Sequence, residues 1–317
     1  MSLFTVICLC YNHELYVEQA LHSIFAQTHR PLQVLIADDA SQDNSVELIK
    51  GFLRQHQDSQ IVVQFIENTH NLGNCQSFNQ LLALAEGKYL LDFSADDVLY
   101  PHAVSACVTF FENQPCNVGA IYANAELINA EGKFLGHYYP PSQIQPSGAL
   151  YGRLLRAGGL VCTVSMVFRR DLMQELRGYN PALFYEDYDF MLRLAQRADL
   201  AYFQATTIRY RQHHQSLSKQ FYDPHKNQRL LESTLETLKQ QAAYCIKNGF
   251  LEDFKQSLRF HFRFCLYTAQ PHLASQFRQL HQTYCGRISI FENILCLLYR
   301  VKFPLALFYK LYRGLRL

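Results

Sequence analysis

Short apolar runs alternate with amphipathic segments along the first 125 residues of the chain. The apolar runs are rich in β-branched residues, as buried strands are, and they cover residues 4–10, 32–37, 61–66, 88–94 and 119–123. Between them, apolar residues recur at every third or fourth position, which predicts helices over about 14–27, 45–55, 77–86 and 101–113. This alternation predicts right-handed crossovers and a mostly parallel central sheet flanked by helices.

The pattern becomes less regular after residue 125 and changes again near Pro224. The elements predicted between these points are a hairpin turn at 129–133, a loop rich in Pro and Ser at 140–148, a strand at 161–168, a helix from about Asp187 and an edge strand at 201–205. From Pro224 onward the spacing of apolar residues is helical. We therefore predict an α/β domain over residues 1–220 and a helical C-terminal region over residues 221–317.

Polar side chains follow four of the predicted strands. In parallel sheets, ligands bind beyond the carboxyl ends of the strands, so these side chains are expected at one rim. In chain order the four clusters are Tyr11 with Asn12, Asp38 with Asp39, Asn68 with Asn71, and Asp96 with Asp97. We take this rim as the candidate active site.

The fourth predicted strand ends on two adjacent carboxylates, Asp96 and Asp97. Like charges side by side repel one another, and the edge of a core removes part of their water. A solvated turn is one explanation, because Asp is common in turns; a bound divalent cation is the other. Carboxylate oxygens suit Mn²⁺ or Mg²⁺ with substrate phosphates completing the coordination, whereas the chain lacks a Cys and His set suited to zinc.

The chain carries neither of two common phosphate-binding loops. No GxGxxG follows the first strand and no GxxxxGK[ST] occurs, so a bound diphosphate would need a cation to balance its charge. Asp38 and Asp39 can accept hydrogen bonds from a nucleobase or ribose, and Tyr11 offers a flat ring on which a base could stack. Helix capping by Ser41 or Asp43 would explain part of that segment, but it leaves Asp38 and Asp39 unexplained.

Composition limits the class of protein. The chain has 317 residues, of which 49% are hydrophobic and 18% charged, so a sizeable core is expected. A formal charge of +2 argues against a dedicated nucleic-acid binder. Ten Cys occur without a CxxC pair, the N-terminus lacks a basic signal-peptide region, and no apolar segment approaches the length of a membrane span. We therefore expect reduced thiols in a cytoplasmic protein.

Four segments together resemble the family-two glycosyltransferases, inverting enzymes with a GT-A fold. They are TVICLCYNHELYVEQALHSIFAQT, LIADDASQDNS, NLGNCQSFNQLLALAEGKYLLDFSADDVLYP and YEDYDFMLRLA, in the order in which the family has them. The resemblance implies that Tyr11 stacks on the donor base and that Asp39 reads it, the base usually being uracil. It further implies a donor pocket lined by Asn71, Gly73 and Asn79, although capping of a helix would explain Asn71 equally well.

The resemblance places Asp96 and Asp97 on the metal-binding DxD segment of the family. Two departures occur: Ser94 stands where many relatives have the first Asp, and Phe78 stands where many have Arg. Metal binding would then depend on Asp96 and Asp97, with Asp97 expected to coordinate the cation directly.

The segment FYEDYDFMLRLA, residues 184–195, is expected to supply the general base. Inversion requires a group that takes the proton of the acceptor hydroxyl opposite the leaving diphosphate, and the resemblance assigns this role to Asp187. The alternative is that Glu186 or Asp187 merely complements a helix N-terminus. Asp189 fits a structural or acceptor-contact role better.

Two further segments carry positive charge. The first is YRQHHQSLS, residues 210–218, in which His213, ahead of His214, is a candidate to bind the metal or a phosphate oxygen. Arg211 in this segment, and Glu186 outside it, are candidate contacts of the diphosphate or acceptor. A basic surface loop is the alternative explanation for residues 210–218. Residues 286–317 carry six Lys and Arg and a single acid, Glu292, with Pro304 as a break. That segment either lies on the cytoplasmic face of the inner membrane or packs on the catalytic domain.

These interpretations predict an inverting, metal-dependent glycosyltransferase. The donor is expected to be a UDP-sugar and the acceptor a hydroxyl of a glycan or lipid-linked glycan, as in bacterial lipopolysaccharide or capsule synthesis. A sugar-nucleotide nucleotidyltransferase is one alternative, but CYNHELY lacks the Gly and basic residues that its phosphate loop would need. A non-catalytic sugar-nucleotide sensor or scaffold is the other.

Overall fold

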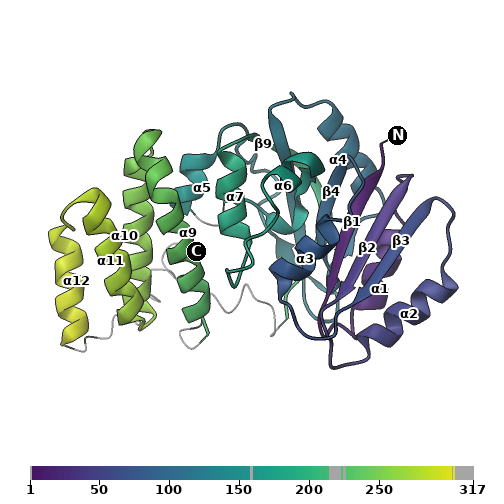
Figure 1. Cartoon of the computed structure of the whole chain (residues 1–317), viewed down its shortest axis with the longest axis horizontal. Helices are drawn as coiled ribbons and strands as arrows, with labels where there is room; N and C mark the ends of the chain where they lie inside the picture. The colour runs from purple at the N-terminus through teal and green to yellow at the C-terminus, as the bar shows by residue number, and fades with distance from the viewer. Residues whose placement is uncertain (1, 158–159, 214–222, 224–225, 302, 304–317) are drawn as a thin grey trace. The chain divides into compact units, whose positions relative to one another are not determined.

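The computed structural model describes residues 2–157, 160–213, 223, 226–301 and 303, and it confirms the α/β class (Figure 1). The chain divides into two compact units. The α/β unit comprises Met1–Tyr151, Gly159–Ala182 and Asp189–His213, and the helical unit comprises Gly152–Gly158, Leu183–Tyr188 and His214–Leu317.

A mixed sheet forms the centre of the α/β unit. Within the described residues it has nine strands, and its hydrogen-bonded order is β3-β2-β1-β4-β8-β6-β9-β5, with β7 paired to β6. The strands are β1 (Phe4–Cys10), β2 (Leu32–Asp38), β3 (Ile61–Glu67), β4 (Tyr89–Ser94), β5 (Val98–Leu99), β6 (Val118–Ile128), β7 (Phe134–His137), β8 (Val167–Arg169) and β9 (Asp199–Arg211).

The first four long strands, β3, β2, β1 and β4, are mutually parallel, as predicted. Every residue of β2 is buried, which is why its sequence is mostly apolar and does not alternate between apolar and polar positions. Because the crossovers are right-handed, α1 (Val17–Phe25) and α2 (Ser45–Gln55) belong on one face and α3 (Asn74–Leu82) on the other. Figure 1 shows α3 in front of the sheet and α1 behind it.

The other half of the sheet brings the end of β9 to the end of β4. Strand β8 lies antiparallel between β4 and β6, and β9 runs parallel to β6. The short strand β5, which directly follows Asp96 and Asp97, pairs with the end of β9 through Val98 opposite Arg209. The sheet therefore carries Arg211 and His213 to the acidic pair.

Several predicted boundaries were wrong. Strand β9 is 13 residues long and lies between β6 and β5, so the predicted edge strand at 201–205 is an interior strand. Its pairing with the long strand β6, which no local pattern reveals, explains the difference. In the predicted strand 161–168, Thr163–Ser165 form a 3₁₀ turn (η1) in which the Ser165 hydroxyl bonds the carbonyl oxygens of Cys162 and Ala123. Helix α3 begins three residues before the predicted start.

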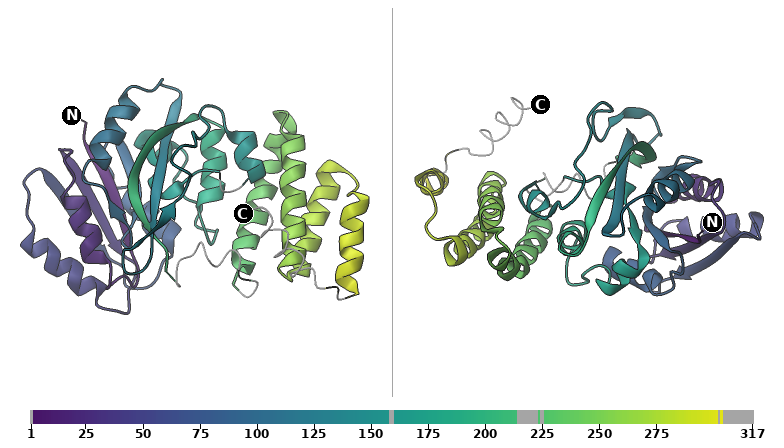
Figure 2. Two further views of the ribbon diagram at one scale, coloured as in Figure 1. Left: turned by 180° about the vertical axis from the view of Figure 1, so that it is seen from behind. Right: turned by 90° about the horizontal axis from the view of Figure 1, so that it is seen from above.

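The remaining helices of the α/β unit are short, and those of the helical unit, apart from the short α5, are longer. The former are α4 (Ala103–Glu112), α6 (Arg170–Glu175) and most of α7 (Asp187–Ala195); the latter are α5 (Tyr151–Ala157), α9 (Gln228–Lys247), α10 (Leu251–Tyr267), α11 (Pro271–Cys285) and α12 (Ile290–Arg300). Helix α10 contacts α9, α11 and α12, which Figure 2 shows side by side. Phe254, Leu258 and Phe277 are among the residues of this core.

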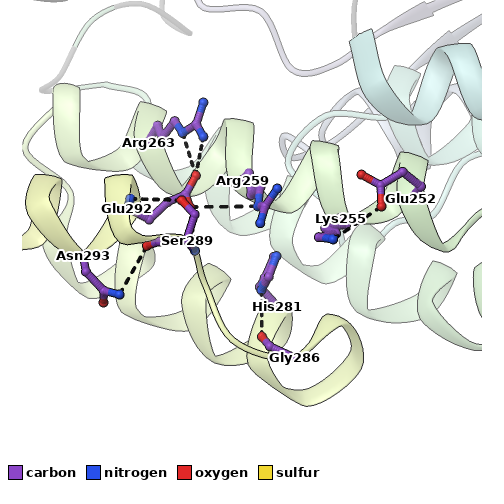
Figure 3. Close-up of polar contacts among 9 residues, drawn as sticks. All are labelled: Glu252, Lys255, Arg259, Arg263, His281, Gly286, Ser289, Glu292 and Asn293. Carbon is purple, nitrogen blue, oxygen red and sulfur yellow. Dashed lines mark hydrogen bonds and ion pairs between the residues drawn. The ribbon is translucent and has the colours of Figure 1, made fainter.

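The single acid of the C-terminal segment faces the interior of the helical unit (Figure 3). Glu292 is fully buried and forms a capping box with Ser289 at the start of α12. Arg263 of α10 donates two hydrogen bonds to Oε1 of Glu292, and Arg259 lies 4.0 Å from Oε2. The ion pair therefore joins α12 to α10. In the part of the chain that the structure describes, we find no helix with the length and apolarity that a membrane crossing requires.

Candidate active site

The loop that follows β1 is held against the loop that follows β2. Asn12 has a positive φ of 57°, its N–H donates to Ser41 Oγ at 2.8 Å, and its Oδ1 accepts the N–H of Gln42 at 2.7 Å. The N–H of His13 donates to Ser45 Oγ at 2.9 Å. These bonds fix the backbone next to Tyr11, whose side chain is 44% exposed and available for stacking.

Asp38 is the last residue of β2 and is fully buried. Its Oδ1 accepts the N–H of Ser41 at 2.8 Å and its Oδ2 accepts the Ser41 hydroxyl at 2.6 Å, which closes a local turn. Neither Ser41 nor Asp43 is the N-cap residue of α2, which is Asn44, although Oδ1 of Asp43 accepts the N–H of Ser45 at 3.0 Å. These contacts give Asp38 a structural role, and its binding of nucleotide stays a prediction.

Asp39 organises the loop between β3 and α3. Its Oδ1 accepts hydrogen bonds from Asn68 Nδ2, the N–H of Leu72 and the hydroxyl of Ser77, at 2.8–2.9 Å. Its Oδ2 accepts the N–H of Gly73 at 2.8 Å. With a single bond to the described residues, Oδ2 retains capacity to accept a hydrogen bond from a nucleobase.

Two predicted donor-pocket residues have defined structural surroundings. Gly73, with φ of 82°, is the N-cap residue of α3, so Asn71 does not cap that helix; Asn71 is exposed. The side-chain amide of Asn79 donates to the carbonyl of Tyr179 at 2.7 Å and accepts its N–H at 2.8 Å. Both polar atoms of Asn79 are thereby engaged, and its predicted contact with the donor remains untested.

The acidic pair lies in the turn between β4 and β5. Asp96 is 8% and Asp97 1% exposed. Oδ2 of Asp96 lies 3.0 Å from Nε2 of His213. Burial acts to raise the pKa of Asp96, but the hydrogen bond from His213 and the nearby His13 hold that pKa below its usual value. Burial, reinforced by the charge of Asp96, raises the pKa of Asp97 well above its usual value.

Arg211 is a buried side chain beneath this pair. Its Nε donates to the carbonyl of Asp96 at 2.7 Å, its Nη1 to the carbonyls of Asn129 and Ala130, and its Nη2 to Gln19 Oε1 at 2.7 Å. The guanidinium thus joins the end of β9 to three other chain segments, those of Gln19, Asp96 and residues 129–130. These contacts make Arg211 a positioning residue in the described chain, and a direct diphosphate contact from it stays a prediction.

His13 and Tyr16 lie near His213 but were not predicted as site residues. The ring of Tyr16 lies 5.4 Å from that of His213 and 4.6 Å from the guanidinium carbon of Arg211. Nδ1 of His13 is buried and has no hydrogen-bond partner among the described residues, and burial lowers the pKa of this ring. The signal was present, because both residues belong to the YNHELY stretch at the carboxyl end of β1.

The acidic pair offers carboxylate oxygens, the ligand type that Mn²⁺ and Mg²⁺ prefer. Among the described residues, no group of three or more His, Cys, Asp or Glu is arranged as a metal cage. Mg²⁺ sites in phosphoryl enzymes, however, often use one or two carboxylates and complete their coordination with substrate phosphates and water. Two buried carboxylates repel one another, and His213 lies beside them. These residues therefore fit a cation that the protein holds together with the substrate phosphates and water.

The segment with the candidate base belongs to the helical unit. Asp187 is the first residue of α7, and both Glu186 and Asp187 are half-buried. Asp189 is buried and accepts a hydrogen bond of 2.8 Å from Arg193, which also donates to the carbonyls of Leu176 and Gly178. Asp189 therefore has the structural contacts expected for it.

The fold and rim define a GT-A type α/β protein. The family model described as glycosyl transferase family 2 matches residues 5–177, and the chain belongs to this family. An uncharacterized glycosyltransferase of Haemophilus influenzae is 26% identical over 217 residues. That match covers 67% of this chain and 66% of the relative, so the chain spans just under two thirds of the relative's length.

Solved structures share the fold at low sequence identity. S. aureus TarS residues 1–349, in complex with UDP-GlcNAc, has a TM-score of 0.70 at 16% identity, covering 99% of this chain and 92% of that one. The mannosyltransferase PcManGT of Pyrobaculum calidifontis, in complex with GDP-Man and Mn²⁺, has a TM-score of 0.56 at 16% identity, covering 96% and 84%. At these identities the likeness establishes the fold alone.

Proposed function

We propose that this protein transfers a sugar, with inversion, from a nucleotide-diphosphate donor to a hydroxyl group of a glycan or lipid-linked glycan. The observation that carries the proposal is the convergence of Asp39, Asp96, Asp97 and His213 at the carboxyl ends of parallel strands in a family-two chain. A role in lipopolysaccharide or capsule synthesis is the context that we infer for such an acceptor.

The nucleotide is proposed to bind between Tyr11 and Asp39. The exposed Tyr11 ring would stack on the base, and Oδ2 of Asp39 would accept a hydrogen bond from its N–H edge, as uracil offers. UDP-sugars are the first candidates, a choice supported by the UDP-GlcNAc in the TarS complex. GDP-sugars are the second, because PcManGT was solved with GDP-Man.

Asp96, Asp97 and His213 are the residues proposed to hold Mn²⁺ or Mg²⁺. When bound, the cation would balance the negative charge of the donor diphosphate. Arg211 keeps the turn in place through its bond to the Asp96 carbonyl and through its N–H, which donates to Oδ1 of Asp97 at 2.7 Å. Mn²⁺ in the PcManGT complex supports this choice of ion.

Asp187 is proposed as the general base. The acceptor oxygen would form a bond to the anomeric carbon as the bond to the diphosphate oxygen breaks, and its proton would pass to the Asp187 carboxylate. The nucleoside diphosphate would then leave with the electron pair of the broken bond. Attack on the face opposite the leaving group accounts for inversion.

We further propose that α12 rests on an anionic membrane surface at the cytoplasmic face. A stripe of large apolar residues on α12 is 48–79% exposed, and it consists of Ile290, Phe291, Ile294, Leu297 and, just beyond the helix, Val301. The one acid of residues 286–317, Glu292, is buried and paired with Arg263, whereas Arg287 is exposed, so its positive charge is available to an anionic surface. Co-sedimentation with vesicles of phosphatidylglycerol and phosphatidylcholine, which should fail for Ile294→Asp with Leu297→Asp, tests this contact.

A panel of UDP- and GDP-sugars, with Mn²⁺ and a glycan acceptor extract, tests the enzymatic proposal. The matched variants are Asp187→Asn and Asp199→Asn, the second altering an acid in the α/β unit outside the site. We expect Asp187→Asn to bind UDP as the unaltered protein does and to lose transfer by at least a hundredfold, with Asp199→Asn unaffected. Unchanged turnover by Asp187→Asn would favour a sensor or scaffold, and formation of a nucleotide sugar from sugar phosphate would favour a nucleotidyltransferase.

A further inference from the structure

The segment with the proposed base is anchored by hydroxyl groups of the helical unit. Helix α9 carries Ser233, Thr234 and Thr237 in its buried face, where aliphatic residues would normally lie. Buried hydroxyls are costly unless they form hydrogen bonds, and Ser and Thr are weak helix formers. Their presence on this face therefore calls for a specific partner.

Two of these hydroxyl groups bind Phe184 and Tyr185, which directly precede the carboxylates of Glu186 and Asp187. The N–H of Phe184 donates to Ser233 Oγ at 2.8 Å. The hydroxyl oxygens of Tyr185 and Thr234 lie 2.7 Å apart, and the Thr234 hydroxyl donates to the carbonyl of Leu230 at 3.0 Å. Because a Thr hydroxyl has one proton, Tyr185 must be the donor to Thr234.

A third contact lies directly after the carboxylates. The hydroxyl of Tyr188 donates to the carbonyl of Leu155 in α5 at 3.0 Å, and it lies 3.3 Å from Ser257 Oγ in α10. In addition, the guanidinium carbon of Arg229 lies 4.1 Å from the centre of the Phe184 ring. Residues on both sides of Glu186 and Asp187 are thus attached to the helices α5, α9 and α10.

We propose that Ser233 and Thr234 of α9 are positioning residues for the acceptor-side carboxylates, so that the C-terminal helices set the orientation of Asp187. This inference rests on the proposed role of Asp187 as the base. A general base must lie within hydrogen-bond reach of the proton that it removes, and small displacements are costly in rate. Helix α9 would therefore affect the chemical step through the orientation of Asp187.

The test uses Thr234→Val, which keeps the branched shape and removes the acceptor for Tyr185. Thr237→Val is the matched control, since this buried Thr is one turn along α9 and has no bond to residues 183–188 among those described. We expect Thr234→Val to lower kcat about tenfold relative to Thr237→Val, with KM for the donor sugar unchanged. Thr234→Ser should restore kcat because it restores the acceptor oxygen.

Amide hydrogen exchange provides the second readout. Thr234→Val should speed exchange in residues 184–188, and Thr237→Val should not. Equal kcat for the two Val variants, or an equal rise in donor KM, would overturn the positioning role. If instead Asp187→Asn retained full transfer, the proposed base itself would be wrong, and the two failures are thereby distinguished.

Discussion

The main-chain N–H of Arg211 donates a hydrogen bond of 2.7 Å to Oδ1 of Asp97, although the two residues are 114 positions apart in sequence. The same residue binds the Asp96 carbonyl through its side chain. The end of β9 is therefore the support on which the acidic turn rests. The acidic pair and His213 face one another because β5 and β9 pair immediately beside them.

Arg211→Met should destabilise the protein by about 3 kcal/mol, because its buried guanidinium satisfies three carbonyls and one amide oxygen that would lose their donor. Urea unfolding measures the change. Arg209→Met is the control, since this neighbouring Arg is 44% exposed in its side chain, and its partners Glu126 and Tyr100 in the described structure lie near the surface. Equal midpoints for the two variants would show that the buried contacts do not support the turn.

Much of the parallel half of the fold could be predicted from the sequence. Strands β1, β2 and β3 are short apolar runs separated by amphipathic segments, and this alternation predicted their parallel pairing through helical crossovers. Strand β9 could not be predicted in the same way. Its length depends on pairing with β6 some 80 positions earlier, as at Val118 opposite Asp199, which no local periodicity reveals.

The candidate site was predictable where its residues follow a strand in the sequence, and not where they depend on pairing between distant segments. Asp39, Asp96 and Asp97 lie just after strands, so their place at the rim could be predicted from position alone. His13 lies in the YNHELY stretch after β1, but only the structure shows that its ring lies 6.5 Å from that of His213. Arg211 was expected to contact phosphate, and only the pairing of β9 with β6 and β5 revealed the acceptors around its guanidinium.

Glu292→Gln should lower the free energy of unfolding by about 2 kcal/mol. The substitution keeps the shape of a fully buried side chain but leaves Arg263, which is 37% exposed, without its anionic partner. Thermal unfolding monitored by circular dichroism measures the change. Glu236→Gln is the control because both members of its pair with Lys239 are 48% exposed, so a shift of under about 0.5 kcal/mol is expected there.

Stability should fall as the pH is lowered from 6.5 to 4, owing to His261. Burial lowers the pKa of this His to about 4, whereas the unfolded residue has a pKa near 6.5. Above about pH 6.5 both states are neutral and stability is complete. Between pH 6.5 and pH 4 the unfolded chain binds a proton at this His that the folded chain does not, which lowers the free energy of unfolding by roughly 3 kcal/mol in total.

His261→Phe keeps an aromatic ring against Phe277, whose ring is stacked on it at 5.5 Å, and should flatten this pH dependence. His272→Phe alters an exposed His of α11 and should leave the slope unchanged. Urea midpoints measured from pH 7.5 to 4 provide the comparison. A slope that persists in His261→Phe would assign the pH dependence to other groups.

The central claim is that Asp96 and Asp97 hold a cation that carries the donor diphosphate. Isothermal titration of UDP, and separately GDP, into the protein with Mn²⁺ or with EDTA tests it most directly. We predict that one nucleotide binds the unaltered protein at least tenfold more tightly with Mn²⁺ than with EDTA, and that Asp96→Ala with Asp97→Ala abolishes this difference while Asp199→Asn retains it. Equal nucleotide affinity in the double variant and the unaltered protein, under both conditions, would contradict the claim.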